Sequence, residues 1–520
     1  MTSTSTSTST STSTSTSGQP GPAIAGSYAD RPPLPVGFGI SLDPGTKRLA
    51  GDLLFGGSPS RVLRLSAAGV ACLDRLASQP VDSVPAGQLA RALTDAGIAH
   101  PSPPESAVPI GVTVIVPVHE RPAMLDRCLA ALAAGHQPVI VVDDGSADQA
   151  GIAAAASRHG ARLIRLERNR GPAAARNAGL RAATTELVAF IDSDCVAGPG
   201  WIEQLLPHFA DPAVGAVAPR VVPLPGAGSA GAYSASNSSL DLGDQQALVR
   251  PGGRVGYLPT AALLVRRGAL ADQPFDERLR VGEDVDLIWR LVEAGWRIRY
   301  QPQVRVEHDE PASWPGLLAR RFRYGSSAAA LARRHPSAIA PLRLHLLPAL
   351  TVAALLGRRP VAAGLAFGAA VASTSVALRR AGVPREGVLN ASWQATGQTW
   401  LGIGRYGTQF AAPLLLAGLI RPWLASRPAT RRQLAGRRLA LASLLLGPPV
   451  TAWFSRRPRL DPARYAIAWI ADDIGYGAGV WTGCLAERKL AALRPSLLVR
   501  PFRIHRLRGS ASRPAAPSAP

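Results

Sequence analysis

The chain has 520 residues, more than one ordinary domain needs, and its 47% apolar and 18% charged residues exclude a wholly disordered protein. The formal net charge is +22, and residues 311–520 account for the excess because they hold 30 basic and only 5 acidic side chains. Four cysteines stand far apart without a CxxC pair. This argues against a disulfide framework or a thiolate zinc site and favours a reducing compartment.

The N-terminal hundred residues predict a tail followed by a small module. Residues 1–35 begin with alternating Ser and Thr and offer little to bury, which predicts a disordered tail; no signal-peptide pattern is visible. Residues 36–100 combine two strand segments, broken by Gly-rich turns, with two or three helical segments, the first capped by Ser66. This order predicts a winged-helix-like module. The Pro-rich residues 101–106 indicate a linker.

From residue 110 onward, apolar strand segments alternate with helical segments. The runs VTVIVPV, VIVVDD, ARLIRLE and LVAFIDSD are typical of strands covered on both faces, and they predict an α/β domain with a parallel sheet. Asp143 and Asp144 end one strand, and Asp192 and Asp194 follow another. Because the carboxyl ends of parallel strands share one edge, we expect both acidic pairs at one crevice.

These acids suit a specific chemistry, although each pair alone is also typical of a helix cap or a solvated loop. The i, i+2 spacing of Asp192 and Asp194 lets two carboxylates face one Mg²⁺ or Mn²⁺, which would offset charge on a departing diphosphate. Glu283 and Asp284 begin an amphipathic helix, where Asp284 can accept a proton and Glu283 raises its basicity. A non-catalytic binding module would require this ordered set to be coincidental.

The blocks VTVIVPVHER, VVDDGSAD, NRGPAAARNAG, FIDSD and GEDVDLIWRL resemble those of inverting family 2 glycosyltransferases, which have the GT-A fold of nucleotide-diphospho-sugar transferases. The resemblance covers about residues 110–335. It implies that Asp284, beside Glu283, is the catalytic base, and that Asp194 and His308 approach the metal. A lone histidine at a strand end is otherwise more often structural. The residues implied to bind the nucleotide sugar are Pro117, Glu120, Asp143, Asp144, Arg176 and Asp192.

Segments outside these blocks narrow the resemblance. The QxxRW motif of processive polysaccharide synthases is absent, and RRFRYG (320–325) stands near its place, which argues against long-chain synthesis. A module containing GDLLFGGSPSRVLRLS before a family 2 domain, with a basic apolar region after it, resembles the glycosyltransferases of the mycofactocin system. That resemblance implies a hexosyltransferase that moves glucose from UDP-glucose to the peptide-derived cofactor premycofactocin and builds a short β-linked oligosaccharide. The alternative is a family 2 enzyme acting on a cell-wall or polyprenyl-phosphate lipid, but such an acceptor gives no reason for a peptide-binding module.

Residues 336–500 predict an apolar, basic and mainly helical region. Its residues 361–378 are uncharged and meet the lower length limit for a membrane span, although their Ala, Gly and Ser content makes insertion weak. An anionic membrane surface explains both the charge and the apolar runs, whereas a nucleic acid explains only the charge. We therefore expect no nucleic acid partner and a peripheral or spanning position at the cytoplasmic face of the cell membrane, with a soluble helical bundle as the alternative. Residues 501–520 predict a disordered tail.

Overall fold

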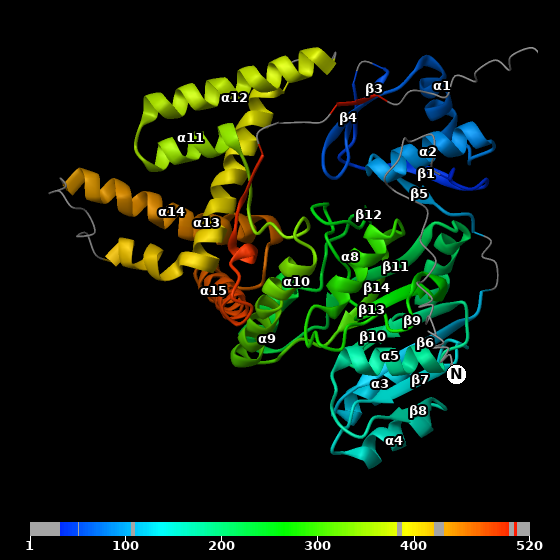
Figure 1. The fold of residues 1–520 in the computed structure, drawn as a ribbon. Coiled ribbons are helices and arrows are strands. Elements are labelled where there is room, and N and C mark those ends of the chain that lie inside the picture. The colour runs from blue at the N-terminus through cyan, green and yellow to red at the C-terminus, as the bar shows by residue number, and fades with distance from the viewer. Residues whose placement is uncertain are drawn as a thin grey trace, which may run out of the picture.

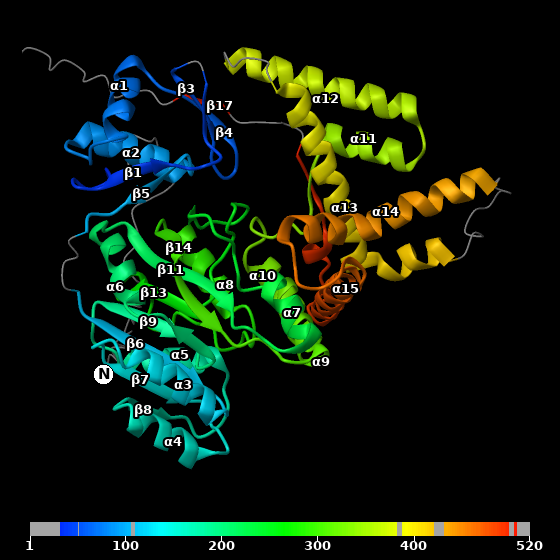
Figure 2. The same cartoon turned by 180° about the vertical axis from the view of Figure 1, so that it is seen from behind.

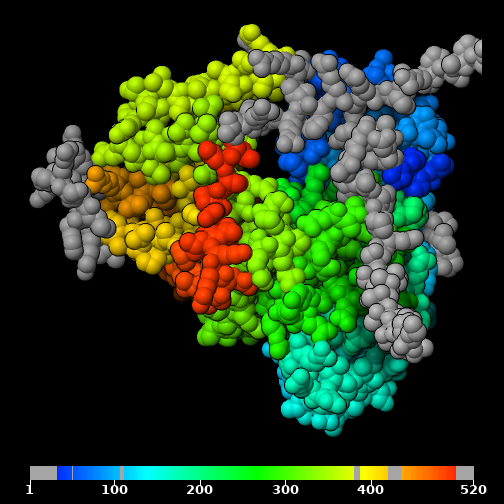
Figure 3. Space-filling model, viewed as in Figure 1, coloured from blue at the N-terminus to red at the C-terminus, as the bar shows by residue number. Residues whose placement is uncertain are grey.

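The computed structural model describes residues 32–49, 51–105, 110–381, 387–420, 431–498 and 504–506. An N-terminal module, an α/β domain and a group of C-terminal helices follow one another along the chain, and both flanking parts contact the α/β domain (Figures 1 and 3). Most of the two tails that the sequence predicts to be disordered lie outside the described residues.

The N-terminal module contains two small sheets and two helices. Its elements are β1 (Gly39–Leu42), β2 (Lys47–Leu49), β3 (Leu53–Gly56), β4 (Arg61–Arg64), α1 (Ala67–Leu76), α2 (Val84–Ala96) and β5 (Ala99–Ser102). Ser66 caps α1 as expected, since its hydroxyl accepts from the Gly69 N–H at 3.2 Å. Leu54, Leu63 and Leu93 are fully buried in a core of the module's own. The predicted C-terminal tail is not wholly irregular, because Ile504–Arg506 form β17, which pairs in parallel with β4.

Three ion pairs, two of them buried, join this module to the α/β domain. Each pair is bidentate, so that both carboxylate oxygens accept from one guanidinium, the geometry that gives the strongest charge-assisted hydrogen bonds. The pairs are Arg91 with Asp211 (2.8 and 2.8 Å), Arg297 with Asp95 (2.8 and 2.9 Å), and Arg254 with Asp43 (2.6 and 3.1 Å). The module is therefore docked on the α/β domain as well as linked to it by the chain.

The α/β domain is built on one sheet. Its strands are β6 (Val112–Val118), β7 (Val139–Asp143), β8 (Arg162–Arg165), β9 (Leu187–Ile191), β10 (Cys195–Ala197), β11 (Val214–Pro223), β12 (Ala247–Leu248), β13 (Ala262–Arg266) and β14 (Arg297–His308). Their order is β10-β14-β11-β13-β9-β6-β7-β8, with β12 paired to β14. The pairs among β6 to β9 are parallel, as predicted. The other half, for which the sequence analysis named no strands, is mixed, because β13 runs antiparallel to β9 and β10 runs antiparallel to β14.

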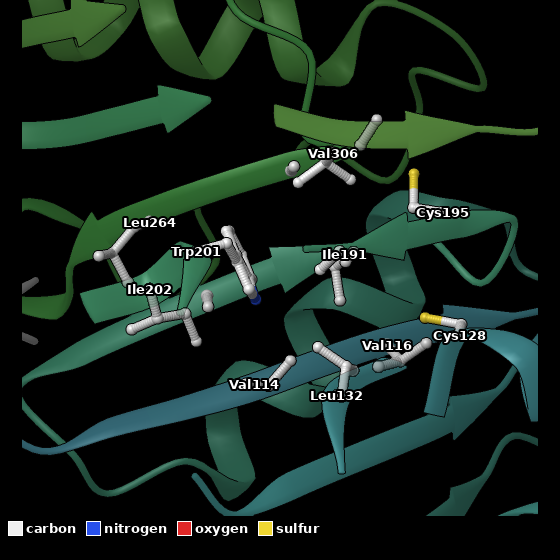
Figure 4. Packing of buried hydrophobic residues seen from close by; sticks show 14 of the residues in the cluster. Val114, Val116, Cys128, Leu132, Ile191, Cys195, Trp201, Ile202, Leu264 and Val306 are labelled. Carbon is white, nitrogen blue, oxygen red and sulfur yellow. The ribbon is translucent and has the colours of Figure 1, made fainter. Parts of the chain in front are cut away.

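Helices cover both faces of this sheet. They are α3 (Pro122–Leu132), α4 (Gln149–Arg158), α5 (Pro172–Ala182), α6 (Trp201–Leu205) and α8 (Glu283–Glu293). Helix α7 (Gly228–Asn237) instead packs its Tyr233 against Leu317 and Tyr465 of the C-terminal helices. Val114 and Val116 of β6 point into the cluster formed with α3, α4 and α6 (Figure 4). Ile115 points into the opposite cluster, formed with α5 and α8. Because alternate residues of β6 are buried on opposite faces, its sequence is an uninterrupted apolar run.

The C-terminal part is helical. Its helices are α9 (Trp314–Ser326), α10 (Ala328–Arg334), α11 (Leu346–Leu356), α12 (Pro360–Ala381), α13 (Val388–Ile420), α14 (Arg431–Arg456) and α15 (Pro462–Ala486), and β15 (Arg343–His345) pairs with β16 (Ser496–Leu498). Glycines let α15 lie directly against α9: a Cβ on Gly479 would fall 2.0 Å from the Phe322 carbonyl oxygen, and one on Gly483 would fall 2.3 Å from that of Ser326. This close packing fixes α15 to the helix that continues from the α/β domain.

Helices α11 and α12 project away from the α/β domain (Figures 1 and 2). Within the described residues, Pro360–Arg379 is the one helical segment long and apolar enough to cross a membrane, with a mean hydropathy of 1.8 and most of its surface exposed. It contains the uncharged residues 361–378 that the sequence singles out, and whether it spans a bilayer stays a prediction.

Candidate active site

A cavity of about 1150 Å³ opens at the carboxyl ends of β6 and β9 and extends toward the C-terminal helices. This volume slightly exceeds that of pockets for a single drug-sized ligand, which measure roughly 300–1,000 Å³. Most of the residues predicted from the sequence line it, and they come from separate parts of the α/β domain. Those lining residues are Pro117, Asp144, Arg176, Asp192, Asp194, Glu283, Asp284 and His308.

The other two predicted residues, Glu120 and Asp143, lie behind the cavity wall. The buried Asp143 carboxylate accepts from Arg165 Nη1 at 2.7 Å and from the Ser146 N–H at 2.9 Å. Glu120 Oε1 accepts from the Ala147 N–H at 2.7 Å. Both carboxylates therefore hold the loop that follows β7, and direct contact of either one with a nucleotide stays a prediction.

Asp144 presents its carboxylate to the cavity. Its two oxygens accept from the backbone N–H groups of Arg170 and Gly171, each at 2.7 Å, at the start of α5. Burial raises the pKa of Asp144, and the two backbone hydrogen bonds oppose this shift. The arrangement fixes the orientation of a carboxylate that can accept hydrogen bonds from a ligand.

Arg176 connects the two predicted acidic motifs. It is buried on α5, where its Nη1 donates to Glu283 Oε1 at 2.7 Å and its Nη2 donates to Asp192 Oδ1 at 2.6 Å. Burial alone would lower its pKa, but the charges of Asp192 and Glu283 outweigh burial and raise it. One guanidinium therefore holds the DxD segment and the first turn of α8 on the same side of the cavity.

The surroundings of the acids at the start of α8 raise the pKa values of both side chains. Burial, and next the charge of Asp284, raises the pKa of Glu283 to about 7. Burial also raises the pKa of Asp284, whose Oδ1 accepts from the Val285 N–H at 2.7 Å. Glu283 is engaged by Arg176, whereas Asp284 is half-buried and faces the cavity. Asp284 is thus the one better placed to reach a substrate hydroxyl.

Asp194 and His308 fit a divalent cation. His308 Nε2 lies 3.6 Å from Asp194 Oδ1. His308 is the last residue of β14, and Asp194 directly precedes β10, which pairs with β14. Burial lowers the pKa of His308, which keeps its imidazole neutral and able to coordinate. No group of three or more His, Cys, Asp and Glu side chains in the described part of the chain could hold a metal alone. A Mg²⁺ or Mn²⁺ ion that keeps positions for phosphate oxygens and water needs no more than two such protein ligands.

The sequence did not reveal the wall opposite these acids. This wall is aromatic and basic, and its residues come from α9, α13, α15 and the loop before β13. They are Tyr257, Arg320, Tyr324, Phe410 and Tyr476. Burial raises the pKa values of all three tyrosines, so their hydroxyls stay protonated and can donate. The segment RRFRYG contains Arg320 and Tyr324 and is the one sequence feature that could have indicated this wall.

The fold and these motifs define the class of the protein. Residues 113–270 match the model of the family described as "Glycosyl transferase family 2", in agreement with the GT-A fold expected from the sequence. Among solved structures, the chain is similar to a mannosyltransferase from Pyrobaculum calidifontis in complex with GDP-Man and Mn²⁺, with 19% identity, a TM-score of 0.36, and coverage of 67% of this chain and 89% of that chain.

Comparison with whole proteins identifies a narrower group than the family model does. The chain is 39% identical over 494 residues to pre-mycofactocin glycosyltransferase of Mycobacterium tuberculosis, covering 89% of this chain and 98% of that protein. It is also 31% identical over 223 residues to the succinoglycan biosynthesis protein ExoU of Rhizobium meliloti, covering 37% of this chain and 60% of that protein. The chain therefore belongs to glycosyltransferase family 2 and, within it, to the family of mycofactocin-system glycosyltransferases.

Proposed function

We propose that the protein transfers glucose from a nucleotide diphosphate sugar, UDP-glucose, to a premycofactocin-type acceptor with inversion at the anomeric carbon. The observation that carries this proposal is the convergence of Asp192, Asp194 and Asp284 on one cavity, with Arg176 tying their two segments together. The acceptor follows from the name of the mycobacterial relative, which aligns over almost its whole length.

The donor occupies the end of the cavity near the parallel strands in this proposal. Asp144 accepts hydrogen bonds from the nucleoside, and Asp192 accepts them from the sugar or ribose hydroxyls. The cations Arg121 and Arg280, which also line the cavity, offset phosphate charge. Glu120 and Asp143 support this end by holding the loop after β7.

The metal-binding residues in this proposal are Asp194 and His308. A bound Mg²⁺ or Mn²⁺ ion supplies stabilisation of the negative charge that develops on the departing diphosphate. Replacing Asp194 by Ala should weaken nucleotide-sugar binding and remove its dependence on the metal, as isothermal titration with and without Mn²⁺ would show. Metal-dependent donor binding that persists in this variant would exclude Asp194 as a ligand.

Asp284 acts as the base. As the acceptor oxygen forms its bond to the anomeric carbon and the bond to the diphosphate breaks, the hydroxyl proton moves to the Asp284 carboxylate. This proposal assigns one carboxylate as base and no residue as nucleophile, which corresponds to a single displacement. An α-linked donor then gives a β-linked product, and repeated transfer gives a short β-linked oligosaccharide.

The acceptor occupies the end of the cavity walled by the C-terminal helices. Tyr324, Phe410 and Tyr476 present aromatic surfaces there, which suit stacking against a flat or sugar ring. The runner-up acceptor is a cell-wall or polyprenyl-phosphate lipid at the membrane. Exposed apolar side chains on α12, such as Val361 and Leu365, are the observation in its favour.

One experiment separates these acceptors and tests the reaction. The purified full-length chain is incubated with UDP-glucose, Mn²⁺ and either a premycofactocin-type acceptor or a polyprenyl phosphate, and the product is examined by mass spectrometry and proton NMR. The proposal expects a β-glucoside of the first acceptor. A glucosyl lipid supports the runner-up, and an α-linked product contradicts inversion.

The flanking parts have proposed roles as well. We propose that residues 36–100 bind the peptide precursor of the acceptor or a partner of its pathway, and that 336–500 associate with an anionic membrane at its cytoplasmic face. The full-length chain should bind the precursor peptide more tightly than a scrambled peptide in a titration. It should also sediment with vesicles that contain anionic lipid and not with neutral ones. Failure of either assay rejects the corresponding role without affecting the assigned reaction.

A further inference from the structure

Helix α13 bends next to the residue that it contributes to the active-site cavity. Pro413 lies inside this helix and has no N–H to donate to the Gln409 carbonyl four residues earlier, and Ala411 has non-helical dihedral angles (φ −137°, ψ 25°). Among the described residues that line the cavity, Phe410 is the one that belongs to α13. The position of its ring therefore depends on how the kink is held.

One face of α15 lies against the kinked part of α13. Asp473, Gly477 and Trp481 are spaced four residues apart, so they lie on the same side of α15. The buried Asp473 carboxylate accepts from Gln409 Nε2 at 2.8 Å and from Arg405 Nε at 3.2 Å, both through its Oδ1. These two donors are one helical turn apart on α13, so a single carboxylate holds the turn that precedes the kink.

The other two residues of this face contact the backbone at the kink. Gly477 lies so close to Gln409 that an added Cβ would overlap the Gln409 carbonyl oxygen, to which Pro413 cannot donate. The indole N–H of Trp481 donates to the Phe410 carbonyl at 3.1 Å. Side-chain and backbone contacts from α15 therefore determine where Phe410 lies.

The half-buried Phe410 ring lies between this support and the cavity. It meets the ring of Tyr406 edge to face, with the centroids 4.9 Å apart, and it packs against the cluster that contains Val480 and Leu493. Tyr406 is itself held, because its hydroxyl donates to the Leu493 carbonyl at 2.6 Å. One side of the Phe410 ring is thus supported by protein, and the ring also lines the cavity.

We propose that Asp473 is a positioning residue for the acceptor, because it holds the kink of α13 and thereby places the Phe410 ring against a flat or sugar ring of the acceptor. This inference rests on the proposed function, which puts the acceptor at this end of the cavity. Asp473 does not line the cavity itself and acts through Phe410. Its loss should therefore weaken acceptor binding and leave donor binding unchanged.

A double-mutant cycle tests this assignment. Phe410→Ala should raise the KM for a premycofactocin-type acceptor by about 3–10-fold, the contribution of one aromatic contact, with the Kd of UDP-glucose nearly unchanged. Asp473→Leu should have a similar effect, and the chain with both substitutions should be little worse than Phe410→Ala alone. Two effects that multiply, or an unchanged acceptor KM in Asp473→Leu, would overturn the proposal.

Two further variants separate positioning from general stability. Asp473→Asn keeps a carbonyl oxygen for Gln409 and should recover most of the acceptor affinity. Asp461→Ala removes the N-cap of the same helix, whose carboxylate accepts from the Ala463 and Arg464 N–H groups. It should lower the Tm and leave the acceptor KM unchanged. A rise in KM as large as that of Asp473→Leu would mean that lost stability explains both variants, and it would reject the positioning role.

A spectroscopic measurement tests the positioning role without an acceptor. Incorporation of 4-fluorophenylalanine in place of Phe410 gives a ¹⁹F NMR signal that reports the surroundings of this ring. Asp473→Leu should shift the signal, and Asp461→Ala should not. If Asp473→Leu does not fold, Trp481→Phe serves instead, because it keeps an aromatic ring at an exposed position and removes the donor to the Phe410 carbonyl. An unshifted signal would overturn the inference, whereas a wild-type chain that does not glucosylate premycofactocin would reject only the proposed acceptor.

Discussion

The guanidinium of Arg176 donates to Glu283 at 2.7 Å and thereby joins helix α5 to the first turn of α8. The same guanidinium reaches Asp192 at 2.6 Å from its other amino group. Two acidic segments that are remote in sequence are thus held in a fixed geometry by one buried cation. The relative position of these two acidic segments consequently depends on Arg176.

Replacing Arg176 by Met should lower kcat/KM by about 10²-fold or more, because Asp192 and Glu283 would repel one another once their shared partner is gone. Arg176→Lys should recover only part of this loss, since a single ammonium cannot donate to both carboxylates in the same fork geometry. Steady-state kinetics with circular dichroism as a control for folding would measure both effects. Activity near the wild-type value in Arg176→Met would contradict the linking role.

The reaction should lose activity in mildly acidic solution. Burial raises the pKa values of Asp284 and Glu283, the latter to about 7, so the base becomes protonated at a higher pH than an ordinary carboxyl group, whose pKa is about 4. The acid limb of the kcat/KM profile should therefore lie well above pH 4. An acid limb at the ordinary carboxyl pKa would show that no buried carboxylate controls the reaction.

The raised pKa of Asp284 also affects the stability of the fold, which should fall as the pH rises, whereas the activity should rise. A carboxyl group whose pKa is higher in the folded than in the unfolded state contributes less to stability as the pH rises from about 4 toward the raised value. At pH 8 the charge of Asp284 therefore opposes folding, and Asp284→Asn should raise the Tm while lowering activity. Differential scanning calorimetry at pH 5 and pH 8 should show the larger gain at pH 8; an equal or smaller gain there would exclude this explanation.

The packing of α15 against α9 should tolerate no side chain at Gly479. An added Cβ would lie 2.0 Å from the Phe322 carbonyl oxygen, so Gly479→Ala should destabilise the chain by about 1–3 kcal/mol, as overpacking does. Gly475→Ala on the same helix is the matched control. Its Cβ would lie 3.6 Å from the nearest atom, in ordinary contact, and Ala favours a helix over Gly by about 1 kcal/mol. Chemical denaturation that gave both variants the same stability would disprove the close approach.

Asp95 should be essential for docking the N-terminal module. Asp95→Ala would leave the buried Arg297 without its bidentate partner, a change that typically costs about 3–5 kcal/mol. Asp74→Ala is the control, because this exposed residue pairs with Arg48 at the surface and should hardly change the Tm. Thermal unfolding of the two variants decides the point, and similar Tm values would refute a tightly docked module.

Periodicity predicted the parallel half of the sheet and could not predict the rest. The run VTVIVPV of β6 is apolar at successive positions because both of its faces are covered, and this signal is local. The segment ALLVR of β13 is equally apolar, but its antiparallel pairing with β9 depends on the path of the chain between them. The composition of a strand does not indicate whether it runs parallel or antiparallel to its neighbour.

The sequence likewise predicted one part of the candidate site and not the other. Local motifs identified Asp192, Asp194 and Asp284, because strand ends and helix starts place their residues predictably. The sequence could not show which of two neighbouring acids faces the cavity. Asp143 turns into the interior and Asp144 into the cavity, because successive side chains at the end of a strand point in opposite directions. Phe410 and Tyr476 could not be foreseen, because helices far along the chain bring them to the cavity.

The turnover number of the Asp284→Asn variant tests the central claim most directly. The substitution preserves the size of the side chain and removes only its ability to accept a proton, so donor binding should stay unchanged. The kcat for glucosyl transfer from UDP-glucose should fall by about 10²–10⁴-fold, the usual contribution of a general base. A kcat close to that of the wild type would contradict the assignment of Asp284 as the base of an inverting transfer.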